Sequence, residues 1–273
     1  WQKSDLLLGQ YWHPLFTADV IPTVLALNTG APFQPFIRNP QARYTIRVGQ
    51  IKIVTAVISQ LDFVSEGPQG RSSIYLRDGG YPNIHFQTSY EDNRIILGAA
   101  ADHKRILPQS RSDGAITNEH LSSFSWMVFS KLTLNRITLK AKLINGENLT
   151  EHLLLGGYFA KYDTLHDTYS NYRPTRHINI WLNGTYGTKH HDAGIFTGWS
   201  KNTSDRRKAD EIAFGRGLDI DQCYRISCFY AYKINSLQFW FEAEYTNATY
   251  LIDPIETGLD YVFEEPASNL RFQ

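Results

Sequence analysis

Apolar and polar residues alternate along most of the chain, and this period of two predicts β-strands. The stretch 43–48 alternates apolar side chains with arginines and a threonine, and the alternation resumes at Ile51 after Gly49. Successive side chains of a strand point to opposite faces, so the pattern indicates a half-buried strand with a bulge at the glycine. The odd positions of 237–245 are apolar and most even ones are polar, which predicts a second such strand.

Three turn dipeptides lie beside alternating runs and predict β-hairpins. They are Asp78-Gly79, Asn145-Gly146 and Asn183-Gly184. Asparagine, aspartate and glycine tolerate the positive φ angles that tight hairpin turns need. Pro82 follows the first of these turns, and because proline cannot donate a ladder hydrogen bond, its strand is expected at a sheet edge.

Helical patterns are scarce. The stretch 204–215 predicts a short helix between Ser204 as N-cap and Gly215 as stop, and residues 118–124 form a weaker candidate. Strands do not alternate with long amphipathic helices, which disfavours a doubly wound α/β fold. The predicted fold class is therefore all-β: an antiparallel β-sandwich, specifically a jelly roll with long loops and one or two short helices.

The predicted organisation has three parts. Residues 1–40 form an extended N-terminal segment, rich in proline and apolar yet without a clear period, that packs on something already folded. Residues 41–253 form the jelly-roll β-sandwich, and residues 254–273 form an extended C-terminal tail. Cys223 and Cys228 are five apart, which on a strand places the thiols on opposite faces and disfavours a disulfide.

Charge and hydropathy narrow the function classes. The 27 basic residues equal the 27 acidic ones among 273, which argues against a basic nucleic-acid-binding patch. No run of 18 apolar residues occurs, so no membrane span is expected.

The sequence carries no nucleophile elbow, phosphate loop, paired-cysteine zinc pattern or calcium loop. His190-His191-Asp192 and Glu151-His152 pair imidazole with carboxylate, but adjacent strand residues point to opposite faces, and polar loops explain the histidine pair better. The chain is therefore expected to be no enzyme, to need no cofactor and to bind no metal.

The C-terminal residues Ser268-Asn-Leu-Arg-Phe-Gln273 resemble the product side of a cut by a chymotrypsin-like viral cysteine protease. They are similar to the potyvirus-type site Glu-Asn-Leu-Tyr-Phe-Gln, with Leu270, Phe272 and Gln273 among the matching positions and Ser268 and Arg271 departing from it. With a first residue that is not methionine, this resemblance implies excision from a polyprotein.

A β-sandwich of this size with such an end resembles a jelly-roll capsid protein of a picorna-like virus. The resemblance implies a structural protein that assembles in the host cytoplasm with copies of itself and similar capsid chains into an icosahedral virion. Its partners would include a host receptor, and direct sequence-specific binding of nucleic acid would be weak or absent.

The alternative is a secreted, extracellular carbohydrate-binding or carbohydrate-active β-sandwich. Its glycan-binding candidates are aromatic and histidine residues: Tyr158, Tyr162, His166, Tyr169, His177 and Tyr186. Its N-glycosylation candidates are two of the four Asn-x-Ser/Thr sequons, Asn148 and Asn202. A third option is a structural or cell-surface sandwich with neither assembly nor catalysis.

Overall fold

Strands make up most of the protein. The computed structural model describes residues 2–25, 30–112, 115–205, 207–251 and 264–273. The strands are β1 (Gln2–Trp12), β2 (Arg38–Val48), β3 (Ile51–Ile58), β4 (Asn83–Glu91), β5 (Ile95–Ile106), β6 (Arg111–Ser112), β7 (Ala115–Ile116), β8 (Leu121–Leu134), β9 (Ile137–Glu147), β10 (Gly156–Asp163), β11 (Thr168–Pro174), β12 (Arg176–Gly187), β13 (His191–Asn202), β14 (Glu211–Arg216), β15 (Ile220–Ile234), β16 (Leu237–Leu251) and β17 (Glu264–Phe272). The helical elements are η1 (Pro14–Phe16), α1 (Ile74–Arg77) and η2 (Thr150–His152).

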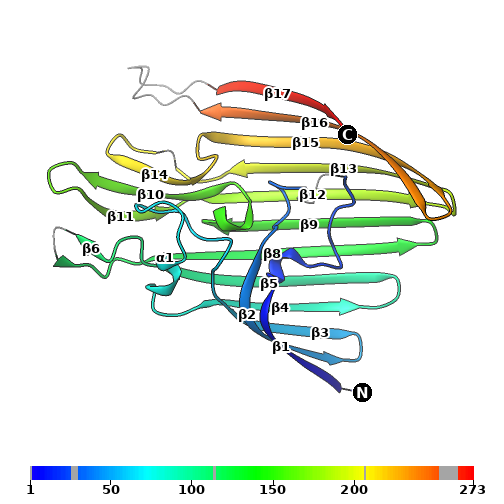
Figure 1. The fold of residues 1–273 in the computed structure, drawn as a ribbon, viewed down its shortest axis with the longest axis horizontal. Helices are drawn as coiled ribbons and strands as arrows, with labels where there is room; N and C mark the ends of the chain where they lie inside the picture. The colour runs from blue at the N-terminus through cyan, green and yellow to red at the C-terminus, as the bar shows by residue number, and fades with distance from the viewer. Residues whose placement is uncertain (1, 26–29, 113–114, 206, 252–263) are drawn as a thin grey trace.

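Twelve strands form one antiparallel sheet in the order β1-β2-β3-β4-β5-β8-β9-β12-β13-β15-β16-β17 (Figure 1). Each of these strands lies beside the next one along the chain, an up-and-down meander. The prediction of an all-β antiparallel fold is confirmed, but the described strands do not form the two packed sheets of a jelly roll. Within the described residues β1 pairs only with β2 and β17 only with β16, so the sheet is open at both edges.

The two ends of the sheet differ in their connections. At one end, which we call the turn end, two or three residues join neighbouring strands, as at Gly49-Gln50, Asn135-Arg136 and Asn235-Ser236. At the other, the loop end, connections are long and carry α1, η2, the β6–β7 hairpin and a three-stranded sheet of order β11-β10-β14 (Figure 1, left). Residues 13–25 and 30–37, which lie between β1 and β2 in the chain, fold back across the sheet.

Two of the predicted hairpin turns lie inside strands. Asn145-Gly146 belongs to β9, where a Cβ on Gly146 would lie 2.4 Å from the Cβ of Ser125 on β8. Asn183-Gly184 belongs to β12. These dipeptides serve a close approach between strands and a side-chain contact rather than a turn. The turns of β8–β9 and β15–β16 instead use Asn135 and Asn235, at φ 50° and 53°.

Other local predictions were wrong for the same reason, that pairing within the sheets overrides local sequence preference. The predicted helix 204–215 holds most of β14, which pairs with β10, and the candidate 118–124 runs into β8. Asp78-Gly79 follows α1 in a long connection. Pro82 precedes β4, which is no edge strand but lies between β3 and β5. Gly49 forms a turn, not a bulge.

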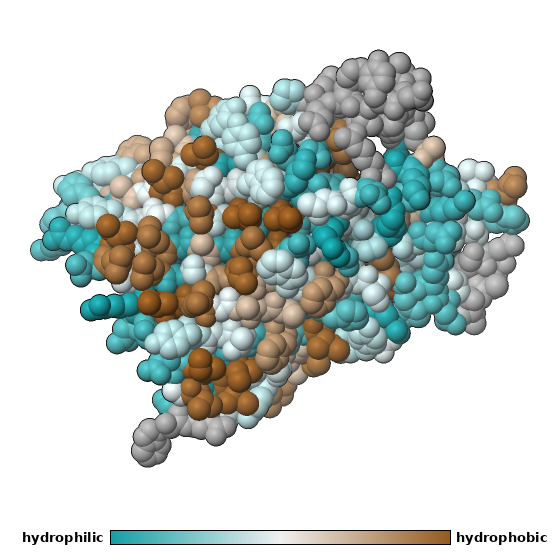
Figure 2. Space-filling view, turned by 180° about the vertical axis from the view of Figure 1, so that it is seen from behind, coloured by the Kyte–Doolittle hydropathy of each residue, from teal (hydrophilic) through white to brown (hydrophobic). Residues whose placement is uncertain are grey.

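The sheet has an apolar outward face that nothing in the described chain covers. On β8, Phe124, Trp126 and Val128 are 40–49% exposed, whereas Ser125 and Met127 between them are buried. Viewed from behind, apolar side chains spread over the sheet, and polar ones gather at the loop end (Figure 2). The usual arrangement of a water-soluble protein, apolar inside and polar outside, is inverted here.

The same inversion holds at the end of the chain. The apolar positions of 237–245 share a strand face as predicted, but Phe239 and Phe241 are 51% and 64% exposed, while Glu242 is buried. Cys223 and Cys228 lie on opposite faces and are both free: Cys223 is buried inward and Cys228 is exposed outward.

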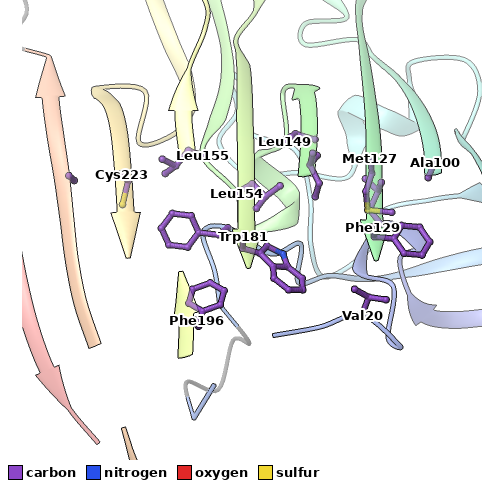
Figure 3. Packing of buried hydrophobic residues seen from close by; sticks show 14 residues of the cluster. Val20, Ala100, Met127, Phe129, Leu149, Leu154, Leu155, Trp181, Phe196 and Cys223 are labelled. Atoms are coloured by element: carbon purple, nitrogen blue, oxygen red, sulfur yellow. The ribbon is translucent and has the colours of Figure 1, made fainter. Parts of the chain in front are cut away.

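The main apolar core lies between the inward face of the sheet and residues 13–37. Leu15, Val20 and Phe33 from this segment pack with Met127 and Trp181 from the sheet. Figure 3 shows Val20 below Met127 and Phe129. Leu149, Leu154 and Leu155 from the connection around η2 complete this core, and a second, smaller core at the loop end contains Tyr75 and Tyr158.

Candidate functional site

Residues 13–37, hereafter the crossing segment, lie on the inward face and reach from β1 to the far side of the sheet. Its described residues are 13–25 and 30–37. Phe16, near its start, contributes to the buried core. Farther along, the backbone of Leu25 contacts β16 and that of Ala31 contacts β15. Polar side chains of the strands hold its backbone, because a segment without a strand partner needs other partners for its N–H and C=O groups.

Two lysines of β9 bind the first half of the crossing segment. Lys142 Nζ donates to the carbonyls of Leu15 and Phe16 at 3.2 and 2.8 Å, and its side chain is about 2% exposed. Lys140 Nζ donates to Ile21 O at 3.0 Å and to Thr23 Oγ1 at 3.1 Å. Carbonyl oxygens therefore satisfy a buried ammonium group that would otherwise carry a large desolvation penalty.

Strands β12, β15 and β16 bind the rest of the crossing segment. Asn183 Oδ1 accepts from the Thr23 N–H at 3.0 Å, and Glu242 Oε2 accepts from the Leu25 N–H at 2.7 Å. Arg225 Nη1 donates to Ala31 O at 3.0 Å. The segment is thereby tied to both halves of the sheet.

Buried aromatic rings hold the part of the crossing segment that leads back to β2. Trp181 Nε1 donates to Gln34 Oε1 at 3.0 Å, and Gln34 Nε2 donates to Phe16 O at 2.7 Å. The ring of Phe33 lies on Gly198 of β13, where an added Cβ would come within 2.5 Å of that ring. Only a residue without a side chain leaves room for Phe33 at this point.

The inward face also carries charged residues, most of them in ion pairs. Besides Glu91, which binds both Arg47 and Lys52, the pairs are Arg225–Glu244 and Lys233–Asp192. The inward face is thus polar and of mixed charge, which suits contact with water rather than with another apolar sheet.

A buried histidine cluster lies at the loop end, where the crossing segment begins. His85 Nδ1 on β4 lies 3.0 Å from Asp102 Oδ2 on β5, and His13 Nε2 lies 3.6 Å from the same oxygen. The His152 ring, from η2, meets the His13 ring edge-on at 4.7 Å. Burial lowers the pKa of His13 well below its usual range, and the Asp102 carboxylate opposes that shift.

Three of the predicted glycan-binding residues come together in the loop-end sheet. Tyr158, Tyr162 and Tyr169 pack around Phe214 and one another, with ring centroids 5.0–5.4 Å apart. Tyr158 is buried, and its burial raises the pKa of the phenol. Tyr158 belongs to the buried core of the loop end, whereas Tyr162 and Tyr169 are only partly buried.

The other predicted residues lie apart from it. His166 is on the β10–β11 turn, His177 is buried near the start of β12, and Tyr186 is exposed toward the turn end of β12. The Asn148 side chain is buried, and Asn202 Oδ1 accepts from the Ser204 N–H at 2.9 Å.

The predicted processing residues belong to the sheet. Leu270 and Phe272 are exposed on β17, and Gln273 continues its pairing with β16 through backbone bonds to Glu242 of 2.9 and 3.0 Å. Strand β1 and the start of β2 fall within residues 1–40, and β17 falls within residues 254–273.

Sequence reasoning missed the inward-facing polar residues that bind the crossing segment. The signal that was present is the run Thr138-Leu-Lys-Ala-Lys142, in which lysines occupy alternate positions of a strand. Two lysines on one face of a strand predict that this face contacts water. The opposite, apolar face must then contact something other than water.

Comparison with known proteins defines the fold alone. No protein-family model and no curated protein sequence matches the chain. The fold is similar to that of outer-membrane expressed OmpT of Vibrio cholerae, with a TM-score of 0.54 and 10% identity over 99% of this chain and 77% of that one. The trimer form of in-vitro folded OmpT from the same organism gives 0.54 and 11% over the same shares. An anion-selective porin from Comamonas acidovorans gives 0.52 and 8% over 89% of this chain and 63% of that one.

These neighbours correct the predicted function. They are outer-membrane β-barrel proteins, so the predictions of a picorna-like capsid protein in a virion, with capsid chains as partners, are wrong. The alternative of a secreted carbohydrate-binding or carbohydrate-active sandwich is wrong as well, and the neighbours, which cross membranes with β-strands, also contradict the expectation of no membrane span. The expectation that the chain is no enzyme stays a prediction. No helix in the described ranges is long and apolar enough to cross a membrane.

Proposed function

We propose that this chain forms the wall of an outer-membrane β-barrel through which small polar solutes pass, and that the crossing segment narrows its lumen. The observation that carries the proposal is the inverted sheet, apolar and uncovered outside, polar and filled by one segment inside. The role requires no catalytic residue and no cofactor.

The outward face matches a lipid environment. Aliphatic side chains such as Leu182, Ile195 and Ile226 are 51–61% exposed in the middle of their strands, and aromatic ones such as Tyr186 and Tyr232 lie toward the strand ends. Transmembrane barrels carry an apolar band flanked by aromatic residues at both interfaces. In water, so large a continuous apolar surface would drive aggregation.

Strand lengths and connections agree with this assignment. The strands of the large sheet have 8 to 15 residues, and a tilted strand needs about 9–11 to cross a bilayer. Short turns at one end and long loops at the other are the usual asymmetry of outer-membrane barrels. The free backbone edges of β1 and β17 require partners in lipid, because an unpaired backbone group there costs several kcal/mol.

The crossing segment determines the width of the lumen. It lies against the inward faces of β8, β9, β12, β15 and β16, and its backbone is bonded to four of these strands. Lys140 and Lys142 hold its first half through carbonyl oxygens and the Thr23 hydroxyl. Removing their amines should free this half without altering the pairing of the strands.

Conductance across a planar lipid bilayer tests the proposal. The purified full chain should produce discrete channel openings, and a variant with both Lys140→Met and Lys142→Met should show a larger or more strongly fluctuating conductance. Lys189→Met is the matched control, because Lys189 is exposed at the β12–β13 turn and lies outside the crossing contacts. Absence of insertion or of channels in the wild-type protein would overturn the proposal, and a double variant identical to wild type would remove the role of the crossing segment.

A further inference from the structure

The histidine cluster gathers side chains from four separate elements. His13 follows β1 at the root of the crossing segment, His85 comes from β4, Asp102 from β5 and His152 from η2. All four side chains are buried, at 1–4% exposure. Imidazole nitrogen and carboxylate oxygen are the ligands that bind Zn²⁺ and its first-row neighbours in proteins.

The spacing of the donor atoms fits one ion. One nitrogen from each of His13 and His85 and one oxygen of Asp102 lie within 4.8 Å of one another. The individual separations from Asp102 Oδ2 are 3.0 Å to His85 Nδ1 and 3.6 Å to His13 Nε2. With metal–ligand bonds of about 2.0–2.2 Å, tetrahedral ligands lie roughly 3.3–3.6 Å apart, so two of the three separations need shifts of a few tenths of an ångström at most.

The cluster also leaves buried polar atoms without partners. Among the described residues, His85 Nε2 and His152 Nδ1 have no hydrogen-bond partner, nor does Asn83 Oδ1 beside them. A cavity of about 10 Å³, roughly the room of one water molecule, borders His13 and His152. Buried polar atoms without partners are rare, and a water in this cavity could serve those that border it, so the surroundings of the cluster are polar enough to hold a hydrated ion.

We infer that His13, His85 and Asp102 form a binding site for a late first-row divalent cation, with Zn²⁺ the best match, and that a water supplies the fourth ligand. The ion would link the first residue of the crossing segment to β4 and β5. Hard cations such as Mg²⁺, which prefer oxygen ligands in octahedral geometry, fit the site poorly.

Binding affects the first turn of the crossing segment. His13 Nδ1 accepts a hydrogen bond from the Leu15 N–H at 3.2 Å, the cap of η1, so Nε2 carries the proton of the neutral ring. A neutral imidazole that coordinates the ion through Nε2 carries its proton on Nδ1, so the ring must change tautomer on binding. A proton on Nδ1 would break the contact with Leu15, and the ion would then replace a cap as the anchor of this turn.

Cobalt spectroscopy on the purified, folded full chain tests the site. Co²⁺ bound by the cluster should give the intense visible absorption of a four-coordinate ion at one equivalent, and Zn²⁺ but not Mg²⁺ should displace it. His85→Gln should weaken Co²⁺ binding by at least about tenfold. His190→Gln is the matched control, because His190 is an exposed histidine at the turn end, and it should bind as wild type does.

Each result decides the question separately from the pore. The site is refuted if the wild-type protein gives only the weak absorption of six-coordinate Co²⁺, or if His85→Gln retains the wild-type spectrum and affinity. If His85→Gln fails to fold, the spectrum and stoichiometry of the wild-type protein decide alone. Metal binding without channel activity would refute the proposed function and support the metal site. Channel activity without metal binding would support the proposed function and refute the metal site.

Discussion

Leu182 offers a direct test of whether lipid covers the outward face. It lies in the middle of β12, is 53% exposed, and neighbours other outward apolar side chains across β9 and β13. For a protein in water, Leu182→Lys would replace a half-exposed apolar group by a charged one and change stability by no more than about 0.5 kcal/mol. For a barrel in a bilayer, it would bring a charge into hydrocarbon.

The expected loss in the bilayer follows from measured costs of charge on the lipid face of barrels. A lysine near the midplane destabilises such a barrel by about 2–4 kcal/mol. At 1.4 kcal/mol per factor of ten, the ratio of folded to unfolded protein falls by roughly 30- to 700-fold. Loss of the leucine contacts with lipid adds to this.

Denaturant unfolding of the protein in phospholipid vesicles measures the free energy of unfolding. Leu165→Lys is the matched control, because Leu165 lies on the β10–β11 turn at the loop end, is 89% exposed and should stay in water. The control should match wild type within about 0.5 kcal/mol. Equal free energies for Leu182→Lys and Leu165→Lys would refute a lipid-facing sheet.

Three further predictions concern packing, acid and thiol chemistry. Gly198→Ala should lower the free energy of unfolding by about 1–3 kcal/mol, because its Cβ would overlap the Phe33 ring, and denaturant unfolding measures this loss. Burial raises the pKa of Glu211, but hydrogen bonds from Arg173 and a backbone N–H outweigh it and hold the pKa below its ordinary 4.5. A carboxyl group whose pKa is lowered by folding stabilises the folded state at pH values above its ordinary pKa. The difference in melting temperature between wild type and Glu211→Gln should therefore be constant above about pH 5 and vanish in stronger acid. A difference that does not depend on pH would contradict the ion pair between Glu211 and Arg173. Cys228 faces outward, so a membrane-impermeant maleimide should label it in denaturant but not in lipid vesicles, and rapid labelling in vesicles would place it in water.

Periodicity predicted the strands because it depends on backbone geometry alone. The alternation in 43–48 and 237–245 lies in β2 and β16, and the five-residue spacing of Cys223 and Cys228 gave their opposite faces correctly. A period of two says which side chains share a face, but it does not say whether water, lipid or a protein core meets that face. The jelly-roll interpretation assumed that apolar positions such as Phe239 and Phe241 point inward, and they point outward.

Turns and the candidate site depended on information beyond local sequence. Asn145-Gly146 and Asn183-Gly184 have the composition of hairpin turns, yet their glycines and amides serve contacts between strands and with the crossing segment. The partners of the crossing segment come from β9, β12, β15 and β16, so no short stretch contains the site. The proline-rich residues after β1 lack a period because an irregular apolar segment is held by contacts with the sheet and not by local pairing.

The contact between the Leu25 N–H and Glu242 has a consequence for folding kinetics. The two residues are 217 positions apart in the chain. Contacts at large sequence separation form late, because the entropy of closing the loop must be met before they stabilise anything. Glu242 takes its final place only once β15 and β16 have paired. The crossing segment, although it precedes these strands in the chain, therefore docks in one of the last folding steps, and refolding should end in a slow unimolecular phase.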